Sequence, residues 1–231
     1  MSRVIELKKI SKIYQMNSGK FQALKSIELS INQGDFVMIM GKSGSGKTTL
    51  LNILGLLNSF DGGQFIFNGE DVTHFSDNQK SFLRNNYFGF IFQQFHLIDS
   101  LTISQNIEVP LLYKGGIKFK ERHEKIDKYL ELVGLRDKKK RMPSELSGGQ
   151  QQRIAIARAL INDPIVILAD EPTGSLDTNT GEKVMKILQK LNAQNKTIIM
   201  VTHDPDMVKY ANKVIYIQDG AVLRMSEHVY S

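Results

Sequence analysis

Short apolar runs recur along the chain, and polar or glycine residues follow each of them at once. The runs lie at Phe36–Met40, Tyr87–Phe92, Ile165–Ala169 and Thr197–Val201. A short continuous apolar run is typical of a strand that is buried on both faces of a sheet. Between the runs, apolar residues recur at helical spacing, as in the segment 181–192, where one face carries Val184, Ile187, Leu188 and Leu191. Alternating strands and helices predict an α/β fold with a mainly parallel sheet.

Two parts of the chain depart from this alternation. Residues 1 to about 40 are predicted as strands with a turn at Gly34-Asp35, and the strand Gln64–Phe67 is followed by the hairpin signal Asn68-Gly69. These segments predict an N-terminal antiparallel β part. Residues 118–133 form an amphipathic helical pattern that Gly134 ends, and a second helix is predicted at 150–161. We therefore expect a helical subdomain at about 95–162, inserted in the core of a single domain that spans residues 1–231.

The composition is that of an ordinary globular domain. The chain has 231 residues, of which 41% are hydrophobic and 23% are charged. No apolar run approaches the roughly 20 residues that span a bilayer, and we expect no secretory signal. The absence of cysteine excludes disulfides and thiol-bound metals. The net charge is +6, but its densest run, Lys138–Arg141, has no interleaved aromatic residues. We interpret it as a solvated loop or a contact with anionic lipid, and we expect no nucleic-acid partner.

A glycine-rich loop follows the first apolar run. Residues 41–48 read GKSGSGKT, a complete G-x-x-x-x-G-K-T pattern, and a helix is predicted at 48–57. Glycines let the backbone approach an anion, and the first N–H groups of the helix point at it. Lys47 is expected to reach the β- and γ-phosphates, and the Thr48 hydroxyl to bind Mg²⁺. The predicted nucleotide-binding residues are Gly41, Lys42, Ser43, Gly44, Ser45, Gly46, Lys47, Thr48 and Thr49.

Two further motifs lie at the ends of predicted elements: an acidic pair after a strand and a capping pattern before a helix. Asp170 and Glu171 end the run Ile165–Ala169, and an aspartate in this place holds Mg²⁺ in phosphate-loop enzymes. Ser147 and Gln150 form a capping-box pattern that starts a helix. The two glycines between them weaken a first helical turn, which favours a need for bare backbone N–H groups there.

The segment Leu146–Gln150 reads LSGGQ, the signature of ATP-binding cassette (ABC) ATPases, and the chain resembles that family over nearly its whole length. The resemblance implies binding and hydrolysis of ATP with Mg²⁺. It implies that Glu171 polarises the attacking water. It also implies that the signature residues contact the ATP held by a second protomer: Ser147, Gly148, Gly149 and Gln150. The string 172–177 looks like the D-loop that crosses to the partner, with Ser175, Leu176 and Asp177.

Single residues extend the resemblance. Tyr14 occupies the place of an aromatic that stacks on adenine, although a tyrosine near the end of a strand also serves ordinary packing. Gln93 matches the Q-loop glutamine, which senses Mg²⁺ and water, and the neighbouring Gln94 leaves the register open by one residue. His203 matches the switch histidine that contacts the γ-phosphate. The catalytic set implied is therefore Lys47, Gln93, Glu171 and His203. The remaining histidines match no motif and are interpreted as surface or partner-facing: His74, His96, His123 and His228.

The runs at 83–98, 143–160 and 168–177 are similar to the branch that serves macrolide, lipoprotein-releasing and antimicrobial-peptide exporters. This similarity implies a peripheral subunit at the cytoplasmic face of the membrane. It would dimerise head to tail on ATP and drive a separate permease with an external domain. The expected permease groove is formed by Phe82, Leu83, Phe95, His96 and Leu97.

Three other functions compete with this interpretation. A translation factor of this family carries two cassettes, and a chromosome-maintenance or repair ATPase carries a coiled coil or zinc motifs, whereas this chain has one cassette and neither addition. A cassette that drives a membrane signalling or cell-division complex without transport would have identical motifs, so this alternative stays open.

Overall fold

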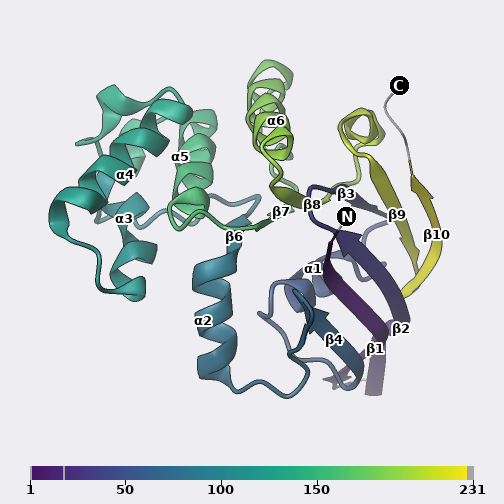
Figure 1. The fold of residues 1–231 in the computed structure, drawn as a ribbon. Helices are drawn as coiled ribbons and strands as arrows, with labels where there is room; N and C mark the ends of the chain where they lie inside the picture. Colours follow the sequence, from purple (N-terminus) through teal and green to yellow (C-terminus); the bar gives the residue numbers. More distant parts are fainter. Residues whose placement is uncertain (1, 18, 228–231) are drawn as a thin grey trace. The chain divides into compact units, whose positions relative to one another are not determined.

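The computed structural model describes residues 2–17 and 19–227 (Figure 1). The chain forms two compact units. Unit 1 contains residues 1–82 and 192–231, and unit 2 contains residues 83–191. The helical stretch expected at about 95–162 falls entirely inside unit 2, together with elements on both sides of it. Among the described residues, no helix combines the length and the apolar character that crossing a bilayer requires.

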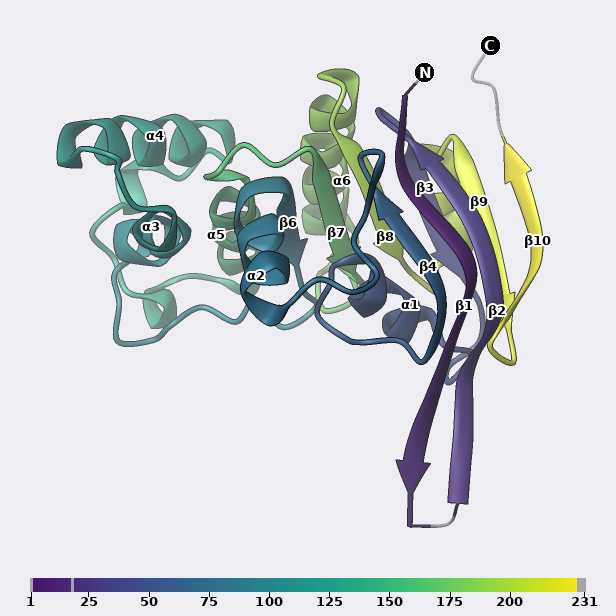
Figure 2. The same cartoon turned by 60° about the horizontal axis from the view of Figure 1, so that its bottom comes forward.

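One sheet of unit 1 is antiparallel. It contains β1 (Arg3–Met16), β2 (Gly19–Asn32), β4 (Gly62–Phe67) and β5 (Glu70–Asp71), in the order β2-β1-β4-β5. Along β1, Ile5 and Leu7 are buried and the polar Glu6 between them is partly exposed. Asn68 and Gly69 both have positive φ, as a tight hairpin turn requires, so the predicted β4–β5 hairpin is confirmed. In Figure 2, the hairpin end of β1 and β2 projects beyond β4.

The other strands of unit 1 are mainly parallel. β3 (Phe36–Met40) pairs in parallel with β8 (Thr197–Val201) on one side and with β9 (Lys213–Gln218) on the other. β10 (Ala221–Glu227) adds an antiparallel edge beside β9. All residues of β3 and β8 are buried, as their unbroken apolar character predicts. Helix α1 (Lys47–Leu54) follows β3, and the 3₁₀ helix η3 (Pro205–Tyr210) follows β8.

Unit 2 combines two parallel strands with helices. β6 (Phe88–Ile91) pairs with β7 (Val166–Asp170), and α3 (Ile103–Lys114), α4 (Phe119–Leu132) and α5 (Gly148–Leu160) pack against one another. Helix α2 (Asp77–Tyr87) precedes β6, and α6 (Thr178–Ala193) follows β7; both cross the unit boundary. The short helices η1 (Arg136–Lys138) and η2 (Pro143–Glu145) join α4 to α5. The α/β class with a mainly parallel sheet and an antiparallel part is thus confirmed.

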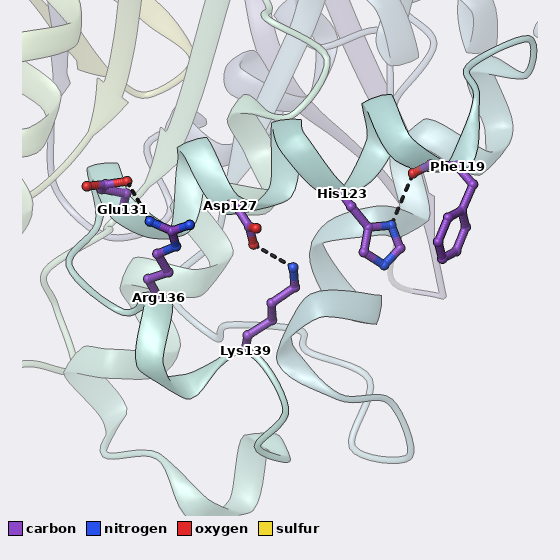
Figure 3. A network of polar contacts seen from close by, with 6 residues as sticks. All are labelled: Phe119, His123, Asp127, Glu131, Arg136 and Lys139. Atoms are coloured by element: carbon purple, nitrogen blue, oxygen red, sulfur yellow. Dashed lines mark hydrogen bonds and ion pairs between the residues drawn. The ribbon is translucent and has the colours of Figure 1, made fainter.

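The basic run 138–141 connects neighbouring helices through ion pairs and backbone hydrogen bonds. Lys139 pairs with Asp127 of α4, and Arg141 pairs with Glu145. The carbonyl oxygens of Lys139 and Arg141 accept N–H groups from the first turn of α3. Figure 3 shows the Asp127–Lys139 pair beside the Glu131–Arg136 pair, with the His123 ring next to the Phe119 carbonyl. The charge of this run is therefore largely engaged within unit 2.

Candidate nucleotide site

The phosphate loop of unit 1 can be formed only with its glycines. Gly44 and Gly46 have φ of 76° and 103°, in the left-handed region that favours glycine. A Cβ on Gly41 would lie 2.2 Å from the Ile217 carbonyl oxygen, and one on Gly46 would lie 2.6 Å from that of Ala23. Backbone atoms of β9 and β2 therefore leave no room for a side chain at Gly41 or at Gly46.

Lys47 lies inside this loop. Its Nζ donates to the carbonyl oxygens of Gly41 (2.8 Å) and Lys42 (2.9 Å), and the side chain is buried. Gly46 caps α1 without a side-chain hydrogen bond, so the first N–H groups of α1 receive no side-chain cap. The buried Ser45 Oγ has no hydrogen-bond partner among the described residues. An ammonium group, uncapped N–H groups and an unpaired hydroxyl form a site that suits phosphate.

The hydroxyl-bearing residues after Lys47 are accessible. Thr48 is exposed and Thr49 is half-buried. Thr48 is thus open to a ligand from solvent, as its predicted role at Mg²⁺ requires. The described residues contain no group of three or more histidine or carboxylate side chains placed to hold a metal ion.

Tyr14 lies near the projecting end of the β1–β2 hairpin and is half-buried. Its hydroxyl accepts a hydrogen bond from Asn58 Nδ2 at 3.2 Å, and the Lys12 ammonium lies 5.3 Å from its ring centroid. Lys12 is held in turn by Asp61. The ring is therefore fixed at its hydroxyl end by a polar network, and its adenine-stacking role stays a prediction.

His203 follows β8 at the same sheet edge as the phosphate loop, because β3 and β8 run in parallel. Its side chain is exposed. The neighbouring residues form a tight turn, in which Thr202 Oγ1 accepts from the Asp204 N–H and Asp204 Oδ1 accepts from the Asp206 N–H. Unit 1 thus places the phosphate loop, which leads to Lys47 at the start of α1, and His203 after the ends of adjacent parallel strands.

Unit 2 brings the Q-loop glutamine and the β7 carboxylate together. Gln93 follows β6 and Glu171 follows β7, and these strands are parallel. Gln93 Nε2 and Glu171 Oε2 each lie 3.2 Å from the position that a Cβ on Gly174 would occupy. Glu171 has φ of 45°, a left-handed conformation that costs a non-glycine residue of order 1–3 kcal/mol and is frequent at functional sites. Asp170 is half-buried at the end of β7.

The signature segment begins α5 as its capping pattern predicts. Ser147 Oγ accepts from the Gln150 N–H, and Gln150 Oε1 accepts from the Ser147 N–H. The glycines have a second role that the sequence did not indicate. A Cβ on Gly149 would lie 2.1 Å from Thr180 Cγ2 of α6, whereas one on Gly148 would make an ordinary contact with the Phe95 ring. Gly149 therefore permits a close approach of α5 and α6.

The predicted D-loop residues lie before and at the start of α6. Ser175 and Asp177 are exposed, and Leu176 is half-buried. Hydrogen bonds from Thr180, first its hydroxyl and then its N–H, lower the pKa of Asp177. Asp177 is thus a charged group at the start of α6, where the helix dipole favours it.

The sequence did not predict the roles of two residues of α5. Gln152 is fully buried and donates to the carbonyl oxygens of Phe92 and Pro172. Arg158 donates to those of Phe95 and His96, and burial lowers its pKa. The available signal was a glutamine on the apolar face of a predicted helix.

Some surface predictions need correction. Leu83 is predicted to lie in the permease groove, but it is buried, because it is the residue that helix α2 packs inward, whereas the adjacent Phe82 is exposed. Phe82 is 61% exposed, Phe95 and Leu97 are half-buried, and His96 is exposed. Of the unassigned histidines, His74 is exposed, His123 is half-buried and His228 lies outside the described residues.

Comparisons with known proteins show the family of the chain. The ABC transporter family model matches residues 24–174. The uncharacterized ABC transporter ATP-binding protein YknY of Bacillus subtilis is 46% identical, over 96% of both chains. The macrolide export ATP-binding/permease protein MacB of Aggregatibacter actinomycetemcomitans is 46% identical over 95% of this chain, which spans only 34% of MacB.

Solved structures extend the comparison to three dimensions. The dimeric post-hydrolysis structure of the ATP-binding cassette MJ0796, bound to ADP and Pi, is 42% identical with a TM-score of 0.91. The match covers 98% of this chain and all of that one. A second solved structure, cbiO1 of Clostridium perfringens, which is part of the ABC transporter complex cbiONQ, is 27% identical with a TM-score of 0.87, and the match covers 98% of this chain and 89% of that one. With its intact phosphate loop, signature and paired carboxylates, the chain belongs to the ABC transporter family as an ATP-hydrolysing ATP-binding cassette.

Proposed function

We propose that this cassette hydrolyses MgATP to power an export transporter whose permease is a separate polypeptide. The observation that carries the catalytic part is the meeting of Gln93 and Glu171 beside Gly174, with an intact phosphate loop in the same chain. The export part is supported by the similarity to MacB, a macrolide export protein whose name joins an ATP-binding part to a permease.

ATP binding is assigned to the phosphate loop and Tyr14. The uncapped N–H groups of α1 and the Lys47 ammonium would hold the β- and γ-phosphates, after Lys47 exchanges its carbonyl partners for phosphate oxygens. The Tyr14 ring would stack on adenine, with its hydroxyl still bound to Asn58.

The residues that would hold Mg²⁺ are Thr48, Asp170 and Gln93. Their hydroxyl, carboxylate and amide oxygens are the ligands that Mg²⁺ prefers. When bound, Mg²⁺ would neutralise the charge that develops on the phosphate oxygens.

Hydrolysis is assigned to Glu171, which would orient the attacking water and accept its proton. Its left-handed backbone sets the direction of the carboxylate relative to β7. Gln93 would report the presence of Mg²⁺ and water, and His203 would contact the γ-phosphate. Each of these roles is a proposal carried over from the family motif.

Two copies would be needed for a complete site. The MJ0796 cassette forms a dimer in its solved structures. In the proposed head-to-tail dimer, Ser147, Gly148, Gly149 and Gln150 of one copy contact the ATP on the phosphate loop of the other, and the D-loop crosses between them. ATP would thus close the dimer, and hydrolysis would open it.

The permease would hold the cassette at the cytoplasmic face of the membrane. Exposed apolar side chains where α3 ends and α4 begins support a partner there, since Leu112, Tyr113 and Phe119 are 58%, 82% and 67% exposed. Together with Phe95 and Leu97 they are the surface of unit 2 that we assign to the permease.

The catalytic assignment is tested with Glu171→Gln, which keeps the size of the side chain and removes its charge. Turnover is expected to fall by roughly 10²–10⁴, while ATP still binds and, with Mg²⁺, traps a dimer visible by gel filtration. Glu182→Gln, at an exposed position of α6, is the matched control and should hydrolyse ATP normally. Normal turnover in Glu171→Gln would remove that residue from catalysis.

The transport assignment is tested by co-purification from membranes and identification of the bound polypeptide. A permease with a large external domain, together with ATP-dependent movement of a solute in vesicles, supports export. The second candidate function is to power a membrane signalling or cell-division complex. Co-purification of such a permease without any ATP-dependent movement of a solute would favour this function.

A further inference from the structure

Gln152 occupies a place where a hydrophobic residue would be expected. It lies on the apolar face of α5, which packs against β6 (Figure 1), and it is fully buried. Its Nε2 donates to the Pro172 carbonyl oxygen at 2.7 Å and to the Phe92 carbonyl oxygen at 3.3 Å. Its Oε1 is buried and has no hydrogen-bond partner among the described residues.

The two carbonyl groups belong to the two catalytic loops. Phe92 immediately precedes Gln93, and Pro172 immediately follows Glu171. One amide therefore holds the backbone next to both side chains that meet at Gly174. Because Gln152 lies in the helix that Ser147 caps, these hydrogen bonds connect the signature segment to both loops.

The functional reading of Gln152 rests on which carbonyl groups it holds. Its unpaired Oε1 is unfavourable, whereas its Nε2 satisfies one carbonyl group in each of the two loops. Asn162, near the other end of α5, provides a comparison. It is also buried, donates to the Asn85 and Pro110 carbonyl oxygens, and has an unpaired Oδ1, but it holds no catalytic loop.

We propose that Gln152 is a positioning residue for ATP hydrolysis, which fixes Gln93 and Glu171 relative to each other and ties both to the signature helix. This inference rests on the proposed roles of Gln93 and Glu171. A shift of α5 on contact with the partner's nucleotide would move both loops in concert.

The test is Gln152→Met, which keeps the length of the side chain and removes its donor. kcat is expected to fall roughly 10–100-fold, because small displacements of catalytic groups have effects of this size, while KM for ATP stays within about twofold. Asn162→Leu is the matched control and should lower Tm while leaving kcat unchanged. Wild-type kcat in Gln152→Met, or a raised KM with unchanged kcat, overturns the inference.

A second variant gives a readout that loss of packing would not produce. In Gln152→Glu, only the protonated carboxyl can donate to a carbonyl oxygen. Relative to wild type, its kcat should therefore rise as the pH is lowered, whereas a constant ratio across pH contradicts the proposal. This readout also applies if Gln152→Met fails to fold.

Coupling to Gln93 separates the two proposals. In Gln93→Ala, the loss of kcat from adding Gln152→Met should be smaller than in wild type, and equal losses of kcat would show that Gln152 acts independently of Gln93.

If Glu171→Gln hydrolyses ATP normally, the proposed function fails. If Glu171→Gln is inactive and Gln152→Met is normal, only the positioning role fails.

Discussion

At the scale of residues, Tyr14 has a ring and a hydroxyl with separable roles. Tyr14→Ala should weaken ATP binding by roughly 1–3 kcal/mol through loss of stacking. Tyr14→Phe keeps the ring and loses only the hydrogen bond from Asn58, so its affinity should stay near wild type. Isothermal titration calorimetry measures the affinity of each variant for ATP and for GTP. The affinities for the two nucleotides should change alike. Unchanged ATP affinity in a folded Tyr14→Ala protein would assign Tyr14 to packing.

Residue-scale features were predictable where their cause is local in sequence. The phosphate loop and the Ser147–Gln150 cap depend on neighbours within a few positions, and both were predicted. The tight contact of Gly149 with Thr180 depends on a residue from another helix, so the sequence offered no signal for it. Gln152 was recognisable only as a polar residue on an apolar face.

At the scale of elements, the approach of α5 to α6 can be tested at one atom. In Gly149→Ala the added Cβ would collide with Thr180 Cγ2. Overpacking of this kind typically lowers the free energy of unfolding by about 1–3 kcal/mol, so we expect a lower Tm. Adding Thr180→Ser removes that methyl group and should recover most of the loss. Gly148→Ala, which meets only an ordinary contact with Phe95, is the control. Failure of Thr180→Ser to rescue would show that another contact limits the approach.

The packing of α5 on β6 has a similar requirement at Gly89. A Cβ there would lie 2.5 Å from the Ala159 carbonyl oxygen, a backbone atom that cannot rotate away. Gly89→Ala should therefore lower the free energy of unfolding by about 1–3 kcal/mol or more. Urea denaturation measures this change. Gly62→Ala of β4 serves as control, since no atom lies within 4 Å of its added Cβ. Equal stability of the two variants would contradict this account.

Elements with a strong pattern were predicted and others were not. The helix expected at 118–133 is α4, whose Ile126, Tyr129 and Leu130 are buried. The pattern did not predict α2, because only Leu83 of that helix is buried, nor α3, which contains Pro110. Amphipathic spacing is thus informative only when a helix buries a continuous face.

At the scale of the whole molecule, the proposed split site predicts complementation. Lys47→Ala and Ser147→Arg should each be inactive, because every site needs both residues from different copies. Mixing equal amounts should restore roughly a quarter of wild-type activity, since about half of the dimers are mixed and each has one intact site. ATPase assays of each protein and of the mixture measure this.

The control for the introduced arginine is Ser144→Arg, at an exposed position before the signature, which should remain active. Full hydrolysis by an ATP-bound protein that stays monomeric at every concentration would refute the head-to-tail dimer. The sequence implied this dimer only through the family resemblance, because a contact between copies leaves no periodic pattern within one chain.

The position of β3 has a consequence for how the molecule is made. β3 ends at residue 40, but its partners on both sides, β8 and β9, begin at Thr197 and Lys213. During synthesis, this wholly apolar strand must wait for most of the chain, with both edges unpaired and open to misassociation. The nascent protein is therefore expected to need protection by chaperones.

The phosphate loop shares this delay. The backbone that encloses Gly41 and Gly46 includes Ile217, and the Gly220 N–H donates to the Ser45 carbonyl oxygen. A ribosome that stops before these residues releases a chain with a complete G-x-x-x-x-G-K-T sequence but no formed pocket. Prematurely ended products should thus be unable to consume cellular ATP, because the loop that is encoded early is among the last parts to assemble.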